Sequence, residues 1–465
     1  MSTPIANMPK QNDWKWWLAL FAVTLFALAM RWYYVSTAVV LNPVRGDAVQ
    51  YYSYAWNMVN HGTFAKDPPG SLSVSPDSYR DPGYPFFLAI WMKFFGTGDA
   101  WYAAVLLCQA LLGALTVLLA TTIGRYWLSP RWAIFAGVLM AAWPHSITID
   151  SYLLSETLFG FLCALGMLFC VSACRKAAAW RGFSAGLAFS AAALTNAVLL
   201  PFGIFLAAFL LWRKFVNRKI FFSIVLGTLL MPTAWAIRNT HTAPSTGDNS
   251  SKDRALLNLV QGAWPEYHSA WRNSFFGNPS EKTYAQAVSA AYQKEYLELK
   301  QSPIDGAKAM LQRFSQHPWK YGIWYLVEKP HLLWDWDIRI GQGDIYVYPT
   351  RRDPFSNSPL WIVTYSICHA INLPLMLLAL ASVFFAWSKR SPLMALDRQC
   401  SRSAVVVVIC LIAFVTTVYT VLQAEPRYSI AFRCFEMLLA VTTLSALSLW
   451  WKNYRHATSQ TSSVP

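Results

Sequence analysis

The feature that most constrains this chain is the recurrence of apolar runs long enough to cross a lipid bilayer. Of its 465 residues, 55% are apolar and 13% are charged. About twenty apolar residues in a helix cover a hydrocarbon core of roughly 30 Å, and about ten runs of that kind are present. The pattern predicts an all-α polytopic membrane protein. We expect spans at roughly 16–38, 101–124, 132–149, 153–174, 182–197, 198–212, 219–237, 358–387, 403–423 and 428–451.

The net charge of +15 comes mainly from short loops between these spans. With the N-terminus in the cytoplasm, the cytoplasmic loops and termini hold seventeen basic residues against the acidic residues Asp13 and Asp397. By the positive-inside rule, this split predicts an inner-membrane protein with cytoplasmic N- and C-termini. It also explains the basic composition without nucleic acid, which we do not expect as a partner. The basic residues are Lys10, Lys15, Arg125, Arg131, Arg175, Lys176, Arg181, Arg213, Lys214, Arg218, Lys219, Lys389, Arg390, Arg398, Arg402, Lys452 and Arg455.

Two long polar segments interrupt the apolar pattern, and this orientation places both outside the cytoplasm. The first covers residues 39–100 and contains a short apolar stretch at 86–95. Ten apolar residues are too few to span a bilayer, so we expect this stretch to form a helix that lies along the interface.

The second external segment covers residues 238–357 and is predicted to be a mainly helical subdomain before the last three spans. Residues 281–300 and 303–314 show the apolar spacing of amphipathic helices. The chain therefore divides into a transmembrane module at 1–237, this loop subdomain, and C-terminal spans with a cytoplasmic tail at 358–465.

Ionisable residues gather at the predicted external ends of the spans. An ionised side chain toward the bilayer centre costs about 2.5–3.5 kcal/mol, so such groups usually face a polar cavity or a partner. A single residue at a helix end can also simply be solvated, but the clustering of many indicates a functional site on the external face. The residues are Asp47, Arg80, Asp81, Asp150, Glu156, Arg238, Glu425 and Arg427.

Asp47 follows Gly46 just after the first span. A carboxylate at this place could act as a general base toward an acceptor hydroxyl. Asp is equally suited to cap the N-terminus of a helix, and neither role excludes the other.

Two arginines lie in proline-containing turns that we expect at headgroup depth, where a planar guanidinium can bind phosphate through two hydrogen bonds. Arg80 precedes Asp81 and could instead pair with that carboxylate or with a lipid headgroup. Arg427 follows Glu425, which could simply neutralise it.

Asp150 and Glu156 flank the predicted external turn between the third and fourth spans. Ser155 with Glu156 is typical of a helix start. The two carboxylates could also orient an acceptor or hold a divalent cation through oxygen ligands.

Five short motifs occur in one order over most of the chain. They are Gly46-Asp47-Ala48 with Tyr51, Arg80-Asp81-Pro82-Gly83-Tyr84-Pro85-Phe86-Phe87-Leu88-Ala89, Leu154-Ser155-Glu156-Thr157-Leu158-Phe159, Ala234-Trp235-Ala236-Ile237-Arg238-Asn239 and Glu425-Pro426-Arg427-Tyr428. Together they resemble the GT-C superfamily of integral-membrane glycosyltransferases, in the branch of the protein O-mannosyltransferases and the lipid A aminoarabinose transferase.

The resemblance implies an inverting glycosyltransferase that moves a sugar from a polyprenyl-phosphate donor to a hydroxyl of a glycan, lipid or protein on the external face. It makes Asp47 the catalytic base, and it places Asp150 and Glu156 beside the acceptor or a divalent cation, the one cofactor considered. No metal ligand is assigned beyond these two. The candidates that the resemblance gives for binding the donor phosphate are Arg80, Tyr84, Arg238 and Arg427.

Two other classes of membrane protein are compatible with many spans and polar interfacial residues. A flippase or transporter of lipid-linked sugars would more often show internal repeats and helices broken at the bilayer midplane, which we do not find in the sequence. An O-antigen ligase or polymerase would also carry a large external loop. It would differ from a polyprenyl-phosphate transferase in using a diphosphate donor.

Overall fold

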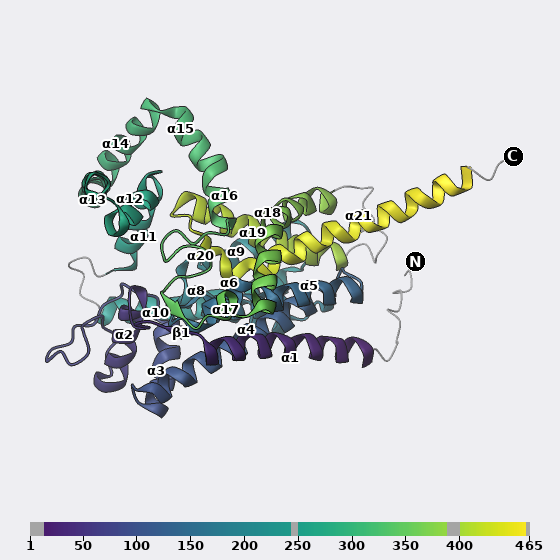
Figure 1. The fold of residues 1–465 in the computed structure, drawn as a ribbon, viewed down its shortest axis with the longest axis horizontal. Helices are drawn as coiled ribbons and strands as arrows, with labels where there is room; N and C mark the ends of the chain where they lie inside the picture. Colours follow the sequence, from purple (N-terminus) through teal and green to yellow (C-terminus); the bar gives the residue numbers. More distant parts are fainter. Residues whose placement is uncertain (1–13, 243–249, 388–399, 462–465) are drawn as a thin grey trace.

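The computed structural model describes residues 14–242, 250–387 and 400–461. Within these ranges the chain is a bundle of helices with one two-stranded sheet, so the predicted all-α class is confirmed. Figure 1 shows the first long helix beginning and the last long helix ending at the same end of the bundle. The polar segments that follow the first span lie at the opposite end.

Seven helices in the described residues are long and apolar enough to cross a membrane, and an eighth span results if one helix pair bent by 58° is counted. The bent pair joins α5 (Pro130–Ala142) to α6 (Pro144–Thr148) and η1 (Ile149–Ser151). The seven are α1 (Trp14–Thr37), α4 (Asp99–Gly124), α7 (Glu156–Lys176), α10 (Arg218–Thr242), α18 (Pro359–Trp387), α19 (Cys400–Val421), and the run of α20 (Pro426–Ser429), η5 (Ile430–Phe432) and α21 (Arg433–Thr461).

The remaining two predicted spans form shorter helices. α8 (Ala179–Thr195) has 17 residues and α9 (Phe202–Trp212) has 11, with η2 (Ala197–Leu199) between them. Both are shorter than the twenty or so residues of a full span. α8 packs against α10 with almost no gap, since a Cβ on Gly186 would lie 2.2 Å from the carbonyl oxygen of Ile224.

The first external segment forms a short strand and two helices: β1 (Val39–Val40), α2 (Asp47–His61) and α3 (Gly83–Phe95). α3 covers the stretch at 86–95 where a helix was predicted. β1 pairs antiparallel with β2 (Thr350–Arg351), which ties the end of the first span to the end of the second external segment. This pairing was not foreseen from the sequence.

The second external segment is helical, as predicted. Its helices are α11 (Ser251–Gly262), α12 (Tyr267–Phe276), α13 (Pro279–Gln301), α14 (Pro303–Gln316), α15 (Pro318–Ile323), η3 (Trp324–Glu328), α16 (Lys329–Trp334) and α17 (Pro354–Asn357). α13 and α14 match the two predicted amphipathic helices. Figure 1 shows α11 to α15 grouped beside the end of the bundle that carries α2.

A buried lysine fixes this group to the bundle. Lys329 begins α16 and is fully buried. Its amine donates hydrogen bonds to the carbonyl oxygen of Gly262, at 2.9 Å, and to that of Leu422, which follows α19. Because the acceptors belong to different segments, Lys329 joins the end of α11 to the end of α19.

Candidate functional site

A cavity of about 290 Å³ lies where the first external segment, α11 and the beginnings of α7 and α20 meet. Asp47, Arg80, Glu156 and Arg427 all line it, so the structure brings together four of the seven residues to which the resemblance gave a role. Thr195 at the end of α8 also lines it. α8 therefore reaches this end of the bundle despite its short length.

Asp47 is the first residue of α2, and its carboxylate is held by two arginines. Arg80 Nη2 lies 2.6 Å from Oδ1, and Arg427 Nη1 lies 2.9 Å from Oδ2. The helix cap is Gly46 and makes no side-chain capping bond, so the capping role considered for Asp47 is not observed. Gly46 has a φ of 55°, a conformation that favours glycine. The glycine thus turns the chain so that Asp47 faces the cavity.

The electrostatics of Asp47 follow from this position. Its side chain is 33% exposed because it faces the cavity, although protein atoms surround it on the other sides. Burial alone would raise the pKa of Asp47, but the guanidiniums of Arg80 and Arg427 hold it well below its usual range. Asp47 is therefore ionised at any physiological pH.

Arg427 connects two carboxylates. While Nη1 pairs with Asp47, its Nε lies 2.5 Å from Oε1 of Glu156, the first residue of α7. Glu425 does not neutralise Arg427 as considered from the sequence. It accepts hydrogen bonds from the backbone N–H groups of Arg339 and Ile340 instead. The bridge fixes the guanidinium of Arg427 at the cavity wall.

A third arginine comes from the second external segment and was missed by the sequence reasoning. Arg254 of α11 lines the cavity and pairs with Asp81, with 2.6 Å between Nη2 and Oδ2. The Arg80–Asp81 contact considered earlier is replaced by this pair. A capping box of Ser250 and Asp253 marks the start of α11, but nothing in the sequence indicates that this helix folds back onto the cavity.

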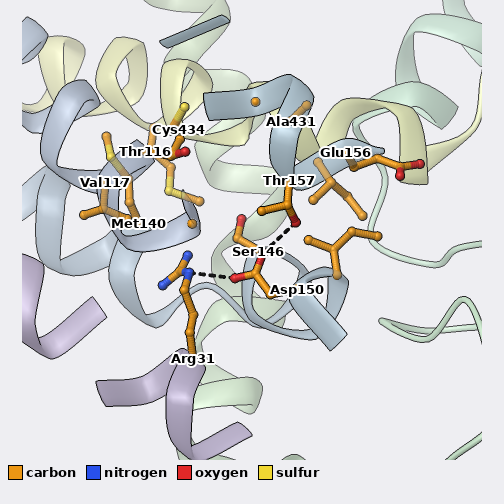
Figure 2. A pocket seen from close by; sticks show the side chains of 15 residues that line it. Arg31, Thr116, Val117, Met140, Ser146, Asp150, Glu156, Thr157, Ala431 and Cys434 are labelled. Atoms are coloured by element: carbon orange, nitrogen blue, oxygen red, sulfur yellow. Dashed lines mark hydrogen bonds and ion pairs between the residues drawn. The ribbon is translucent and has the colours of Figure 1, made fainter. Parts of the chain in front are cut away.

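Asp150 lies inside the bundle, away from the cavity wall. Its Oδ2 is 3.0 Å from Nε of Arg31 in α1, and both side chains are 2% exposed. Thr157 donates a 2.6 Å hydrogen bond to Oδ1. Figure 2 shows Arg31 and Asp150 pointing toward each other beside a small cavity of about 40 Å³, with the Glu156 carboxylate pointing away. The predicted pairing of Asp150 with Glu156 around an acceptor or cation is therefore not what the structure shows.

Tyr84 and Arg238 also lie outside the cavity wall. The fully buried Tyr84 donates a 2.7 Å hydrogen bond to Oε1 of Gln109. Arg238 donates to the carbonyl oxygens of Asp77 and Phe64 and lies over the Trp235 ring. Both side chains hold neighbouring segments together. Their positions do not support the phosphate-binding role that the resemblance implied.

The side chains that line the cavity are poorly suited to hold a metal ion. Across residues 14–242, 250–387 and 400–461, no three His, Cys, Asp or Glu side chains are grouped so that they could hold one. The carboxylates of Asp47 and Glu156 line the same cavity, but Arg427 bridges them. A divalent cation would have to displace that guanidinium before it could bind both.

Comparison with known proteins supports the fold. No family model and no curated protein matches the sequence. The apo oligosaccharyltransferase of Archaeoglobus fulgidus matches with a TM-score of 0.51 and 12% identity over 97% of this chain and 53% of that chain. The same enzyme with an inhibitory peptide and a dolichol-phosphate matches with a TM-score of 0.52, 13% identity, and 97% and 52% coverage.

ArnT from Cupriavidus metallidurans bound to undecaprenyl phosphate matches more loosely, with a TM-score of 0.34 and 15% identity over 93% of this chain and 78% of that one. This chain spans about half the length of the oligosaccharyltransferase, at 53% and 52% in the two structures. At such low identities the likeness shows the fold alone. The chain therefore shares its fold with the Archaeoglobus fulgidus oligosaccharyltransferase.

Proposed function

We propose that this protein is an inverting glycosyltransferase that moves a sugar from a polyprenyl-phosphate donor to a hydroxyl of a glycan, lipid or protein. The observation that carries the proposal is Asp47, held between Arg80 and Arg427 on the wall of a cavity at one end of a membrane bundle. A base and two cations in reach of one another are the groups that such a transfer needs.

The donor phosphate is proposed to bind the guanidiniums that line the cavity. Arg80, Arg254 and Arg427 come from three separate segments, and each is paired with a carboxylate. A phosphate that enters the cavity competes with those carboxylates for the same donors. A membrane-anchored donor also has to react close to the interface, which fits a cavity at the end of the bundle.

Donor binding would then prepare Asp47 for catalysis. A carboxylate whose pKa is held low by two arginines is ionised but a weak base. A phosphate shared by Arg80 and Arg427 brings negative charge close to Asp47, which raises its pKa. We therefore expect the donor to bind before the acceptor can be deprotonated.

In the proposed step the acceptor oxygen forms a bond to the anomeric carbon as the bond from that carbon to the phosphate oxygen breaks. Asp47 takes the hydroxyl proton, and the arginines stabilise the charge that develops on the departing polyprenyl phosphate. In-line displacement inverts the anomeric carbon without a covalent enzyme intermediate. No step is assigned to a metal ion, because the cavity carboxylates are bridged by Arg427.

The location of the reaction is also proposed. The excess of basic residues in the loops at the other end of the bundle favours an inner-membrane protein with its cavity on the external face. The oligosaccharyltransferase with the same fold has been captured with a dolichol-phosphate and an inhibitory peptide, and also with Zn and sulfate. A lipid phosphate in a cavity of this fold is thus a reasonable ligand to test.

The test is release of polyprenyl phosphate by the purified full chain in nanodiscs, with a panel of polyprenyl-phosphate-linked sugars and acceptor-containing membranes. We expect release that depends on one donor sugar and on the acceptor. Activity with diphosphate donors alone would favour a ligase or polymerase. Movement of intact donor across proteoliposomes without sugar transfer would favour a flippase, and either result would overturn the proposal.

A further inference from the structure

A second hollow lies at the end of the bundle opposite the candidate active site. It is a groove of about 1050 Å³ between the beginning of α5 and the middle of α21. The indole N–H of Trp127, in the turn before α5, donates a 2.7 Å hydrogen bond to Oγ1 of Thr442 in α21 and so holds the two walls together. Arg125 in the same turn lies over the ring of Trp16 near the start of α1. The groove is therefore at the end where α1 begins.

The walls of the groove change from polar at its outer end to apolar farther into the bundle. Arg131 and Lys452 are exposed at its outer end, while Phe135 and Leu444 line it farther into the bundle. With a rise of 1.5 Å per residue, Phe135 lies about 6 Å deeper than Arg131, and Leu444 about 12 Å deeper than Lys452. A phospholipid has the same arrangement, with a charged headgroup above an acyl chain.

The outer end of the groove carries positive charge from Arg131 and Lys452. Among the residues that the structure describes, neither Arg131 nor Lys452 is paired with a carboxylate. The cap residue of α5, Ser129, lines the groove and makes no side-chain capping bond, so the first N–H groups of that helix add to the positive potential. A neutral lipid would leave these charges uncompensated.

We propose that this groove binds an anionic phospholipid of the leaflet opposite the candidate active site. Its phosphate would lie between Arg131 and Lys452, with the hydroxyl of Ser448 available as a further donor, and one acyl chain would lie along Phe135 and Leu444. Basic pockets between transmembrane helices bind anionic headgroups in this way, with each cation near the surface adding to the affinity. The site does not depend on the proposed enzyme activity.

Native mass spectrometry of the detergent-purified full chain tests the proposal, with titration of phosphatidylglycerol or phosphatidylcholine. Two cations predict a preference for phosphatidylglycerol on the order of 10- to 30-fold. The double variant Arg131→Gln/Lys452→Gln should lose most of it. The matched control Arg218→Gln/Lys219→Gln removes the same charge from exposed residues at the start of α10, outside the groove, and should keep it.

A third variant distinguishes binding in the groove from a general attraction of anionic lipid to positive charge. Ser448→Trp places a bulky ring in the groove without changing the charge, and it should also weaken the phosphatidylglycerol binding. The proposal is overturned if wild type shows no preference, if both double variants lose it equally, or if Ser448→Trp binds the lipid as well as wild type does.

Discussion

Asp150 and Glu156 lie six residues apart in the sequence but belong to two ion-pair networks with different surroundings. Asp150 pairs with Arg31 inside the bundle, where both side chains are 2% exposed. Glu156 pairs with Arg427, which also holds Asp47, and that network lines a cavity. Both networks pair arginine with carboxylates, but the first is buried inside the bundle and the second faces a cavity that a ligand can enter.

The difference indicates which charges can act in chemistry. A sealed pair cannot exchange its partner for a ligand, and breaking it leaves an uncompensated charge in a medium of low dielectric. The partners in the cavity network can be replaced by a phosphate that enters from the solvent or the interface. We therefore propose a structural role for the Arg31–Asp150 pair and a chemical role for the network around Asp47.

The largest expected effect comes from breaking the sealed pair. Arg31→Met leaves the Asp150 carboxylate buried without its cation, and we expect a loss of about 3–5 kcal/mol in the free energy of unfolding. The melting temperature of the purified variant measures it. Adding Asp150→Asn should restore most of the stability, because the amide is neutral and its oxygen can still accept from Thr157. If the double variant stays as unstable as Arg31→Met, the pair is not the cause.

A smaller effect is expected at the third cavity arginine. Arg254→Ala should weaken binding of a polyprenyl-phosphate donor roughly tenfold, since one charge-assisted hydrogen bond is lost. Donor affinity in nanodiscs measures this. Arg272→Ala is the control, because Arg272 is half-exposed and its pair with Asp337 is long, at 3.9 Å. Equal losses in both variants would remove Arg254 from the donor site.

A pH-dependent effect on stability is expected at a buried amine held by carbonyl groups. Burial lowers the pKa of Lys329 to about 7 from its usual 10.5. Between these values the unfolded chain binds the extra proton, so the free energy of unfolding should rise with pH by at most about 1.4 kcal/mol per pH unit. Lys329→Met should be less stable and should lack this rise. The melting temperature between pH 7 and 10 measures it, and parallel curves for wild type and variant would contradict the assignment.

The sequence predicted the parts of the fold that depend on local composition. Apolar runs located the long helices, and apolar spacing located α13 and α14. The break between α8 and α9 lies near the predicted boundary at 197/198, but both helices are shorter than a full span. The β1–β2 pair joins residues about three hundred positions apart, which no local pattern can indicate.

The candidate site was predicted in part for the same reason. Asp47, Arg80, Glu156 and Arg427 lie in turns and helix starts at one end of the bundle, and a topology argument can bring such residues together. Arg254 depends on how α11 folds back, which is set by tertiary contacts. Asp150 and Glu156 face different ways because a non-helical stretch separates η1 from α7, so sequence spacing does not fix their relative direction.

The most direct test of the central claim is Asp47→Asn in the purified, correctly inserted protein. The amide keeps the shape but removes the basic oxygen, so transfer should fall roughly 10²–10⁴-fold. Because Arg80 and Arg427 are then released from a carboxylate, donor affinity should stay the same or increase. Turnover and donor binding are measured on the same preparation in nanodiscs. Near-normal turnover, or a loss of donor binding that accounts for the whole defect, would contradict the assignment of Asp47 as the base.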